Sequence, residues 1–71
     1  MTDMNYERAK VFLKKNIKVH ISKSNGIYYN GYITEVSSGF FFIEDQEDGR
    51  QLVFFLELNK PIEEYNSKGA G

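Results

Sequence analysis

Apolar and polar residues alternate near the middle of the chain, in the order Ile17, Lys18, Val19, His20, Ile21 and Ser22. A period of two residues is typical of a β-strand with one buried face, so we predict a first strand over residues 17–23. Asn25 and Gly26 follow, and both adopt a positive φ angle at little cost, as a tight hairpin turn requires. The pattern therefore predicts a β-hairpin.

The second strand of this hairpin, residues 27–36, is too long to stay flat and contains Gly31. A glycine inside a strand marks a bend, a bulge or the close approach of another backbone. Ser38 and Gly39 then turn the chain into a third strand, residues 40–44. Three short antiparallel strands with a bent middle strand predict the beginning of a small barrel.

Two further strands complete the predicted barrel. Residues 45–49 are polar and acidic, and we expect a solvated hairpin tip. The fourth strand, residues 50–56, contains an apolar run that faces both sides, which a half-exposed strand of a monomer tolerates poorly. Pro61 cannot donate to a β-ladder, so the fifth strand, residues 62–65, is predicted to lie at an edge. We expect residues 66–71 to form a flexible tail.

Residues 3–15 form an amphipathic pattern with a helical period, in which Ala9, Phe12 and Leu13 lie on one stripe. Asn16 is a suitable left-handed C-cap. A helix of about three turns is marginal alone, so we expect it to cover an open end of the barrel. The predicted fold is mainly β: one domain over residues 1–65, with an N-terminal α-helix followed by a five-stranded, strongly bent antiparallel barrel of the SH3-like type.

The composition excludes several classes of protein. The chain has 71 residues and no cysteine, which excludes a disulfide framework, a zinc ribbon and a thiol nucleophile. So small a core is marginally stable, and oligomerisation is one common source of additional stability. No apolar run approaches the about 20 residues that span a bilayer, and no signal-peptide pattern opens the chain. We expect a soluble, cytoplasmic protein with no membrane partner.

The charges are divided unevenly along the chain. Residues 1–30 carry six Lys and Arg against two Asp and Glu, a net charge of +4, whereas residues 31–71 carry three against eight, a net charge of −5. Two halves of opposite net charge can produce a basic binding face. They can equally produce two ordinary solvated faces. The acidic isoelectric point of about 5.7 argues against broad nonspecific binding of duplex DNA.

Catalytic and metal-binding groups are scarce. His20 is the single histidine, on the polar face of the first strand, whereas a catalytic triad or a metal site needs several converging groups. The acidic residues of the predicted hairpin tip lack the spacing of a calcium-binding loop. The sequence therefore predicts neither an enzyme nor a cofactor or metal site.

Three tyrosines on the second strand, Tyr28, Tyr29 and Tyr32, allow two interpretations. Beside Lys18 and Lys23 they could stack single-stranded bases while the lysines contact phosphates. Alternatively, some fill the core and the others cover a contact between subunits, where tyrosine is common.

The segments Asn25-Gly26-Ile27 and Gly31-Tyr32-Ile33, with their spacing, resemble the Sm/Lsm family and its bacterial Hfq branch over residues 6–65. The resemblance implies a homo-oligomeric ring of six or seven subunits that binds single-stranded RNA.

The sequence departs from the family at three places. Ser37-Ser38-Gly39 replaces a loop with Asp and Asn, Phe54-Phe55-Leu56-Glu57 replaces an Arg-Gly or Lys-His pair, and Ser22 stands near the position of a base-stacking aromatic ring. A structural or protein-interaction module without a nucleotide pocket is the alternative.

Two sets of candidate residues follow. Charge and the resemblance together indicate an RNA-binding set, which consists of Arg8, Lys14, Lys15, Ser22, Ser38 and Phe55. The apolar fourth strand and the edge position of the fifth indicate an oligomer interface, which consists of Val53, Phe54, Phe55 and Ile62.

Overall fold

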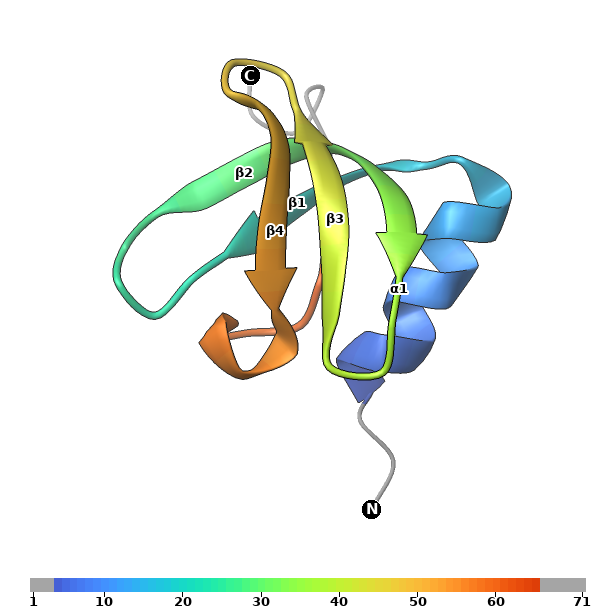
Figure 1. The fold of residues 1–71 in the computed structure, drawn as a ribbon, viewed down its shortest axis with the longest axis horizontal. Helices are drawn as coiled ribbons and strands as arrows, with labels where there is room; N and C mark the ends of the chain where they lie inside the picture. The colour runs from blue at the N-terminus through green and yellow to red at the C-terminus, as the bar shows by residue number, and fades with distance from the viewer. Residues whose placement is uncertain (1–3, 66–71) are drawn as a thin grey trace.

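The computed structural model describes residues 4–65, which form one helix and five antiparallel strands (Figure 1). The elements in chain order are α1 (Met4–Lys15), β1 (Lys18–Ser22), β2 (Tyr28–Val36), β3 (Phe40–Asp45), β4 (Gly49–Phe54), the 3-10 helix η1 (Phe55–Glu57) and β5 (Glu63–Glu64). The strands form one curved sheet in the order β4-β3-β2-β1-β5. The predicted mainly β fold is therefore confirmed.

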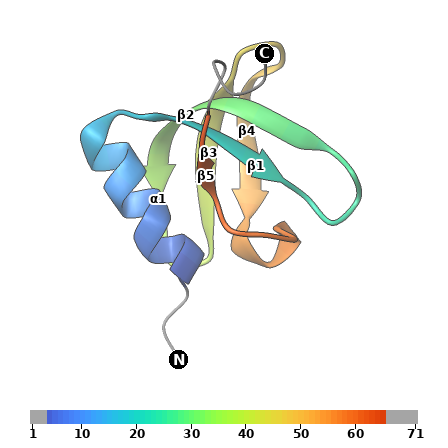
Figure 2. The same ribbon diagram turned by 180° about the vertical axis from the view of Figure 1, so that it is seen from behind.

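The core lies on the concave side of this sheet and confirms the alternation in the sequence. Its buried residues come from the helix, from the four longer strands, from η1 and from the segment just before β5: Ala9, Val19, Ile21, Ile33, Phe41, Ile43, Val53, Phe55 and Ile62. The helix α1 lies beside the sheet (Figure 2). It packs on this core through Tyr6, Phe12 and Leu13, as the amphipathic stripe predicts. Asn16 ends the helix with a φ angle of 55°.

The strand β2 contains two separate irregularities. At Gly31 its backbone lies directly against the carbonyl group of Glu44 on β3, so the glycine marks the close approach of another backbone, one of the three expectations from the sequence. The register of β2 against β3 shifts further on, between Ile33 and Glu35. A shift of one residue is typical of a β-bulge, which increases the local bending of a strand.

The strand β4 ends earlier than the sequence predicts. It stops at Phe54, and the chain turns through η1 instead of continuing as a strand to residue 56. The turn allows Phe55 to enter the core with 6% of its surface exposed, whereas Leu56 is 96% exposed. The strand β5 is also shorter than predicted, with two residues rather than four.

The predicted tail at residues 66–71 lies outside the described residues. Within residues 4–65, no helix has both the length and the apolar character that a membrane crossing needs.

Candidate functional site

The outer strands of the sheet, β4 and β5, each have an edge that no other described strand covers. Directly after β4, the N–H of Phe55 donates to the carbonyl of Gly39 at 3.1 Å, one step beyond the paired residues of the β3–β4 ladder. Bonded and non-bonded pairs alternate along an antiparallel ladder. The backbone groups of Arg50, Leu52 and Phe54 therefore point away from β3, toward the open edge.

The open edge at β5 follows from the hydrogen bonds between β5 and β1. The N–H of Tyr65 donates to the carbonyl of Lys18 at 2.8 Å, and Glu64 stands opposite a neighbouring residue of β1. Alternation then directs the backbone groups of Glu64 away from β1, and those of Ile62 as well.

Side chains of α1 occupy part of this edge. The N–H of Ile62 donates to Asn5 Oδ1 at 2.9 Å, and the carbonyl of Ile62 accepts from Arg8 Nε at 2.7 Å. We name this pair of contacts the Asn5–Arg8 clamp. The guanidinium of Arg8 also lies 5.6 Å from the ring centre of Phe12. Arg8 is therefore engaged within the chain, although the sequence indicates it as an RNA-binding residue.

The convex side of β3 and β4 carries an apolar surface, which we name the outer apolar face and define as Phe40, Phe42, Leu52 and Phe54. The ring of Phe40 contacts those of Phe42 and Phe54 edge to face, at centroid distances of 5.8 and 5.9 Å. Leu52 and Phe54 are 43% and 46% exposed. Arg50 covers one end of the face, with its guanidinium 4.2 Å from the ring centre of Phe42.

Three of the four residues predicted for an oligomer interface lie inside the chain's own core. Val53, Phe55 and Ile62 are buried, and Phe54 alone among the four is exposed. The reason is the period of two in β4, which turns Val53 inward and Phe54 outward. Phe54 is accompanied on the outer apolar face by three residues outside the predicted set, Phe40, Phe42 and Leu52.

The residues predicted to bind RNA do not converge on one pocket. Lys14 and Lys15 are exposed in the last turn of α1, whereas the turn between β2 and β3, which contains Ser38, lies beside the beginning of that helix (Figures 1 and 2). Ser22 lies at the end of β1, where its carbonyl accepts from the N–H of Asn59 at 3.1 Å. Phe55 packs against Phe41 in the core, with 5.2 Å between the ring centres.

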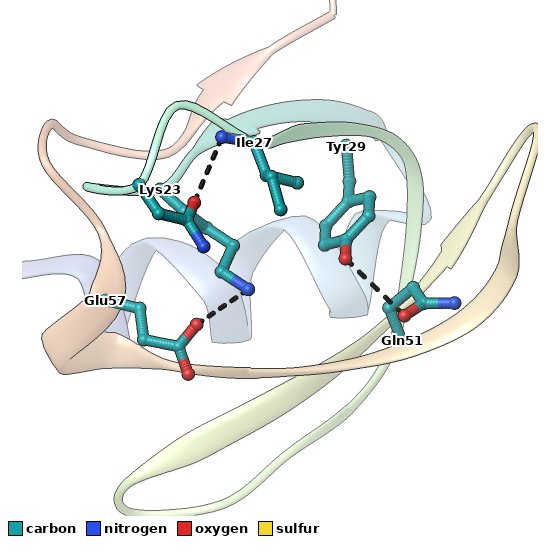
Figure 3. A network of polar contacts seen from close by, with 6 residues as sticks. Lys23, Ile27, Tyr29, Gln51 and Glu57 are labelled. Atoms are coloured by element: carbon teal, nitrogen blue, oxygen red, sulfur yellow. Dashed lines mark hydrogen bonds and ion pairs between the residues drawn. The ribbon is translucent and has the colours of Figure 1, made fainter.

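A polar network joins the β1–β2 hairpin to the segment after β4 (Figure 3). Lys23 Nζ lies 2.8 Å from Glu57 Oε1, and the two side chains are 14% and 34% exposed. The hydrogen bond between them raises the pKa of Lys23 and lowers the pKa of Glu57, and burial opposes both shifts. Nearby, Tyr29 Oη lies 3.5 Å from Gln51 Oε1. The sequence indicates Lys23 as a possible phosphate contact. In the structure its ammonium group stays charged and is paired with the carboxylate of Glu57.

The three tyrosines of β2 divide between the core and the surface. Tyr29 is half-buried and packs against the core, whereas Tyr28 is 62% exposed and Tyr32 is 43% exposed. The ring of Tyr28 lies 5.7 Å from that of His20, and His20 Nδ1 lies 2.5 Å from Asn30 Oδ1. Tyr28 and His20 therefore form a pair of rings on the convex side of the sheet, in which Tyr28 is exposed and His20 is half-buried.

Asp45 corrects the expectation of a fully solvated hairpin tip, because it is only 8% exposed. Its carboxylate accepts three backbone N–H groups, from Asn30 at 2.9 Å, Glu47 at 3.0 Å and Asp48 at 2.8 Å. Burial raises the pKa of this carboxyl group, but the three N–H donors outweigh burial and hold the pKa below its ordinary value. Asp45 therefore stabilises the β3–β4 turn.

Among the described residues, no group of three His, Asp or Glu is arranged to hold a metal ion.

Comparison with known proteins identifies the fold. No protein-family model and no curated protein matches the sequence. Among solved structures, a crystal structure of the pleiotropic translational regulator Hfq matches with a TM-score of 0.72, over 86% of this chain and 98% of that chain. The chain has the Hfq fold. The two sequences are 15% identical, so the likeness to Hfq concerns the Sm-like arrangement of the helix and the five strands.

Proposed function

We propose that the chain assembles into a cyclic homo-oligomer of six or seven subunits and that this ring binds single-stranded RNA. The observation that carries the proposal is the pair of open edges, at β4 and β5, together with the outer apolar face beside β4. The Hfq fold supports it through the resemblance to Sm-like proteins, which form rings.

The open edges favour self-assembly because unpaired strand edges beside apolar surface add strands from another chain. An edge of β4 that pairs with the edge of β5 in a second copy is a heterologous contact, and a repeated heterologous contact closes into a ring when the rotation allows it. Assembly would also cover Leu52 and Phe54, each of which exposes more than two fifths of its surface.

Two features support RNA as the ligand. Lys14 and Lys15 are exposed at one end of α1 and can contact phosphates. The exposed ring of Tyr28 can stack an unpaired base. Hfq, the protein with the matching fold, is named a translational regulator, and regulation of translation is consistent with binding to RNA.

The test is a fluorescence-anisotropy titration with labelled oligo-U and oligo-A over a series of salt concentrations. We expect saturable binding by at least one oligonucleotide, with an affinity that falls as salt rises because counterions are released on binding. The absence of binding to both oligonucleotides at low salt, by a protein that is folded and assembled, would contradict RNA binding.

A second candidate function is a structural or protein-interaction ring that keeps the assembly and has no nucleotide pocket. Phe55 is buried in the core, Lys23 is paired with Glu57, and Ser22 offers no ring for stacking. Assembly without RNA binding in the titration would favour this function.

A further inference from the structure

The open edges of the sheet restrict how two copies of the chain can pair. An antiparallel contact forms hydrogen bonds between residues whose backbone groups point toward the partner. On β4 these residues are Arg50, Leu52 and Phe54, and at the β5 edge they are Ile62 and Glu64. In every register that forms backbone hydrogen bonds, an edge-facing residue of β4 must therefore stand opposite an edge-facing residue of the β5 edge.

The side chains select one of these registers. With Arg50 opposite Glu64, Leu52 stands opposite Ile62, so that an opposite-charge pair and an apolar pair form together. A shift of two residues in one direction places Leu52 opposite Glu64, and a shift in the other direction places Arg50 opposite Ile62. Opposite charges directly across a ladder stabilise it, and a charge opposite an apolar residue forgoes this contribution.

The faces of the two strands pair in the same way in each of these registers, because a shift of two residues leaves every side chain on its own side of the sheet. Residues directly opposite each other in a ladder share a face of the sheet. Glu64 stands opposite the buried Val19, so it shares the core side of β5 with Ile62. Leu52 and Phe54 of the second copy would then lie on that side, next to α1.

A hollow on α1 lies where these apolar side chains would arrive. Arg8, which binds the carbonyl of Ile62, is also part of its wall. The residues that line the hollow are Glu7, Arg8, Val11 and Phe12. Val11 is 47% exposed, and a neighbouring Leu52 or Phe54 would cover it.

We propose, on the basis of the assembly proposed above, that β4 of one copy pairs with the β5 edge of the next with Arg50 opposite Glu64 and Leu52 opposite Ile62, and that this pairing displaces the Asn5–Arg8 clamp. In the free chain, the clamp satisfies the N–H and the carbonyl of Ile62, which would otherwise be unpaired beside the core. On assembly, the backbone of Leu52 from the neighbouring copy takes the place of the clamp. The occupant of the edge is thus a second copy of this chain.

A charge swap tests the register. The concentration at which half of the protein is assembled is measured by sedimentation velocity for Arg50→Glu, Glu64→Arg and the double variant. We expect each single variant to raise this concentration about three- to tenfold per contact, because attraction becomes repulsion, and the double variant to restore it. Glu63→Arg is the matched control, because the backbone of Glu63 points toward β1 and its side chain lies on the opposite face.

The outcomes separate the register from the assembly itself. A wild-type chain that stays monomeric overturns the proposed ring. If the wild type assembles, an equal effect of Glu63→Arg and Glu64→Arg, with no restoration in the double variant, overturns the register and leaves the ring intact.

The clamp has its own test in Arg8→Met, which keeps an unbranched apolar side chain at this position and removes the donor to the carbonyl of Ile62. Because assembly no longer has to break this hydrogen bond, we expect half-assembly at a concentration about fivefold lower. A midpoint that is unchanged or higher, in a variant that circular dichroism shows to be folded, would overturn displacement of the clamp.

Discussion

The backbone of Gly31 on β2 lies directly against the carbonyl oxygen of Glu44 on β3, so that a Cβ atom at residue 31 would overlap that oxygen. Gly31→Ala must therefore move one strand away from the other. We expect a loss of about 1–3 kcal/mol in the free energy of unfolding, as is usual for overpacking. Urea denaturation followed by circular dichroism measures this loss.

Gly39→Ala is the matched control, because a Cβ atom there meets nothing within 4 Å. Its free energy of unfolding should stay close to that of the wild type. Equal stability of the Gly31 and Gly39 variants would contradict the close approach of β2 and β3.

Asp45 makes the stability of the β3–β4 turn dependent on pH. Because its pKa is lower in the folded chain than in the unfolded chain, its contribution is complete above the unfolded pKa of about 4 and is lost as the pH falls through the folded pKa. Asp45→Asn replaces one acceptor oxygen by a donor, and we expect a loss of about 1–3 kcal/mol at pH 7. Thermal unfolding between pH 2 and pH 7 should show a weaker pH dependence in the variant, and an identical profile would count against this role.

Lys14 and Lys15 should contribute to RNA affinity through phosphate contacts. In the double alanine variant we expect weaker binding of oligo-U or oligo-A. The slope of log affinity against log salt should also become smaller, by about one for each phosphate that the variant no longer neutralises. Anisotropy titrations at several salt concentrations measure both quantities.

Lys60→Ala, which removes an exposed lysine outside α1, is the control. An unchanged affinity and slope in the double variant would exclude this end of α1.

The outer apolar face should be covered on assembly. Phe54→Glu places a carboxylate at the centre of a contact that is otherwise apolar, and burial of an unpaired charge is strongly unfavourable. We expect the variant to dissociate into folded monomers in light scattering. Tyr28→Glu makes the same change at an exposed aromatic residue on β2, the central strand of the sheet, and it should leave the oligomer intact. Dissociation by both variants would argue against a specific role of Phe54.

The sequence predicts the order of the elements because each depends on local rules. The alternation of Val19 and Ile21 with polar neighbours defines β1, Asn25 and Gly26 define the hairpin, and Asn16 ends the helix. The end of β4 could not be predicted in the same way. The apolar run continues through Phe55 and Leu56, and only the packing of Phe55 against the core determines where the strand becomes a turn.

The candidate site was less predictable because it depends on contacts between distant segments. The clamp joins Asn5 and Arg8 to Ile62 across more than 50 residues of sequence. The burial of Asp45 depends on an N–H from Asn30 on another strand. The pairing of Lys23 with Glu57 likewise engages a cation that the sequence alone presents as available for a ligand.

Whether the chain forms a ring through β4 and β5 is decided by the molar mass of the wild-type protein in solution. Size-exclusion chromatography with multi-angle light scattering gives this mass without assumptions about shape. We expect a single species of several times the 8.3 kDa chain mass, corresponding to six or seven subunits. A well-folded monomer at high micromolar concentration would contradict ring formation.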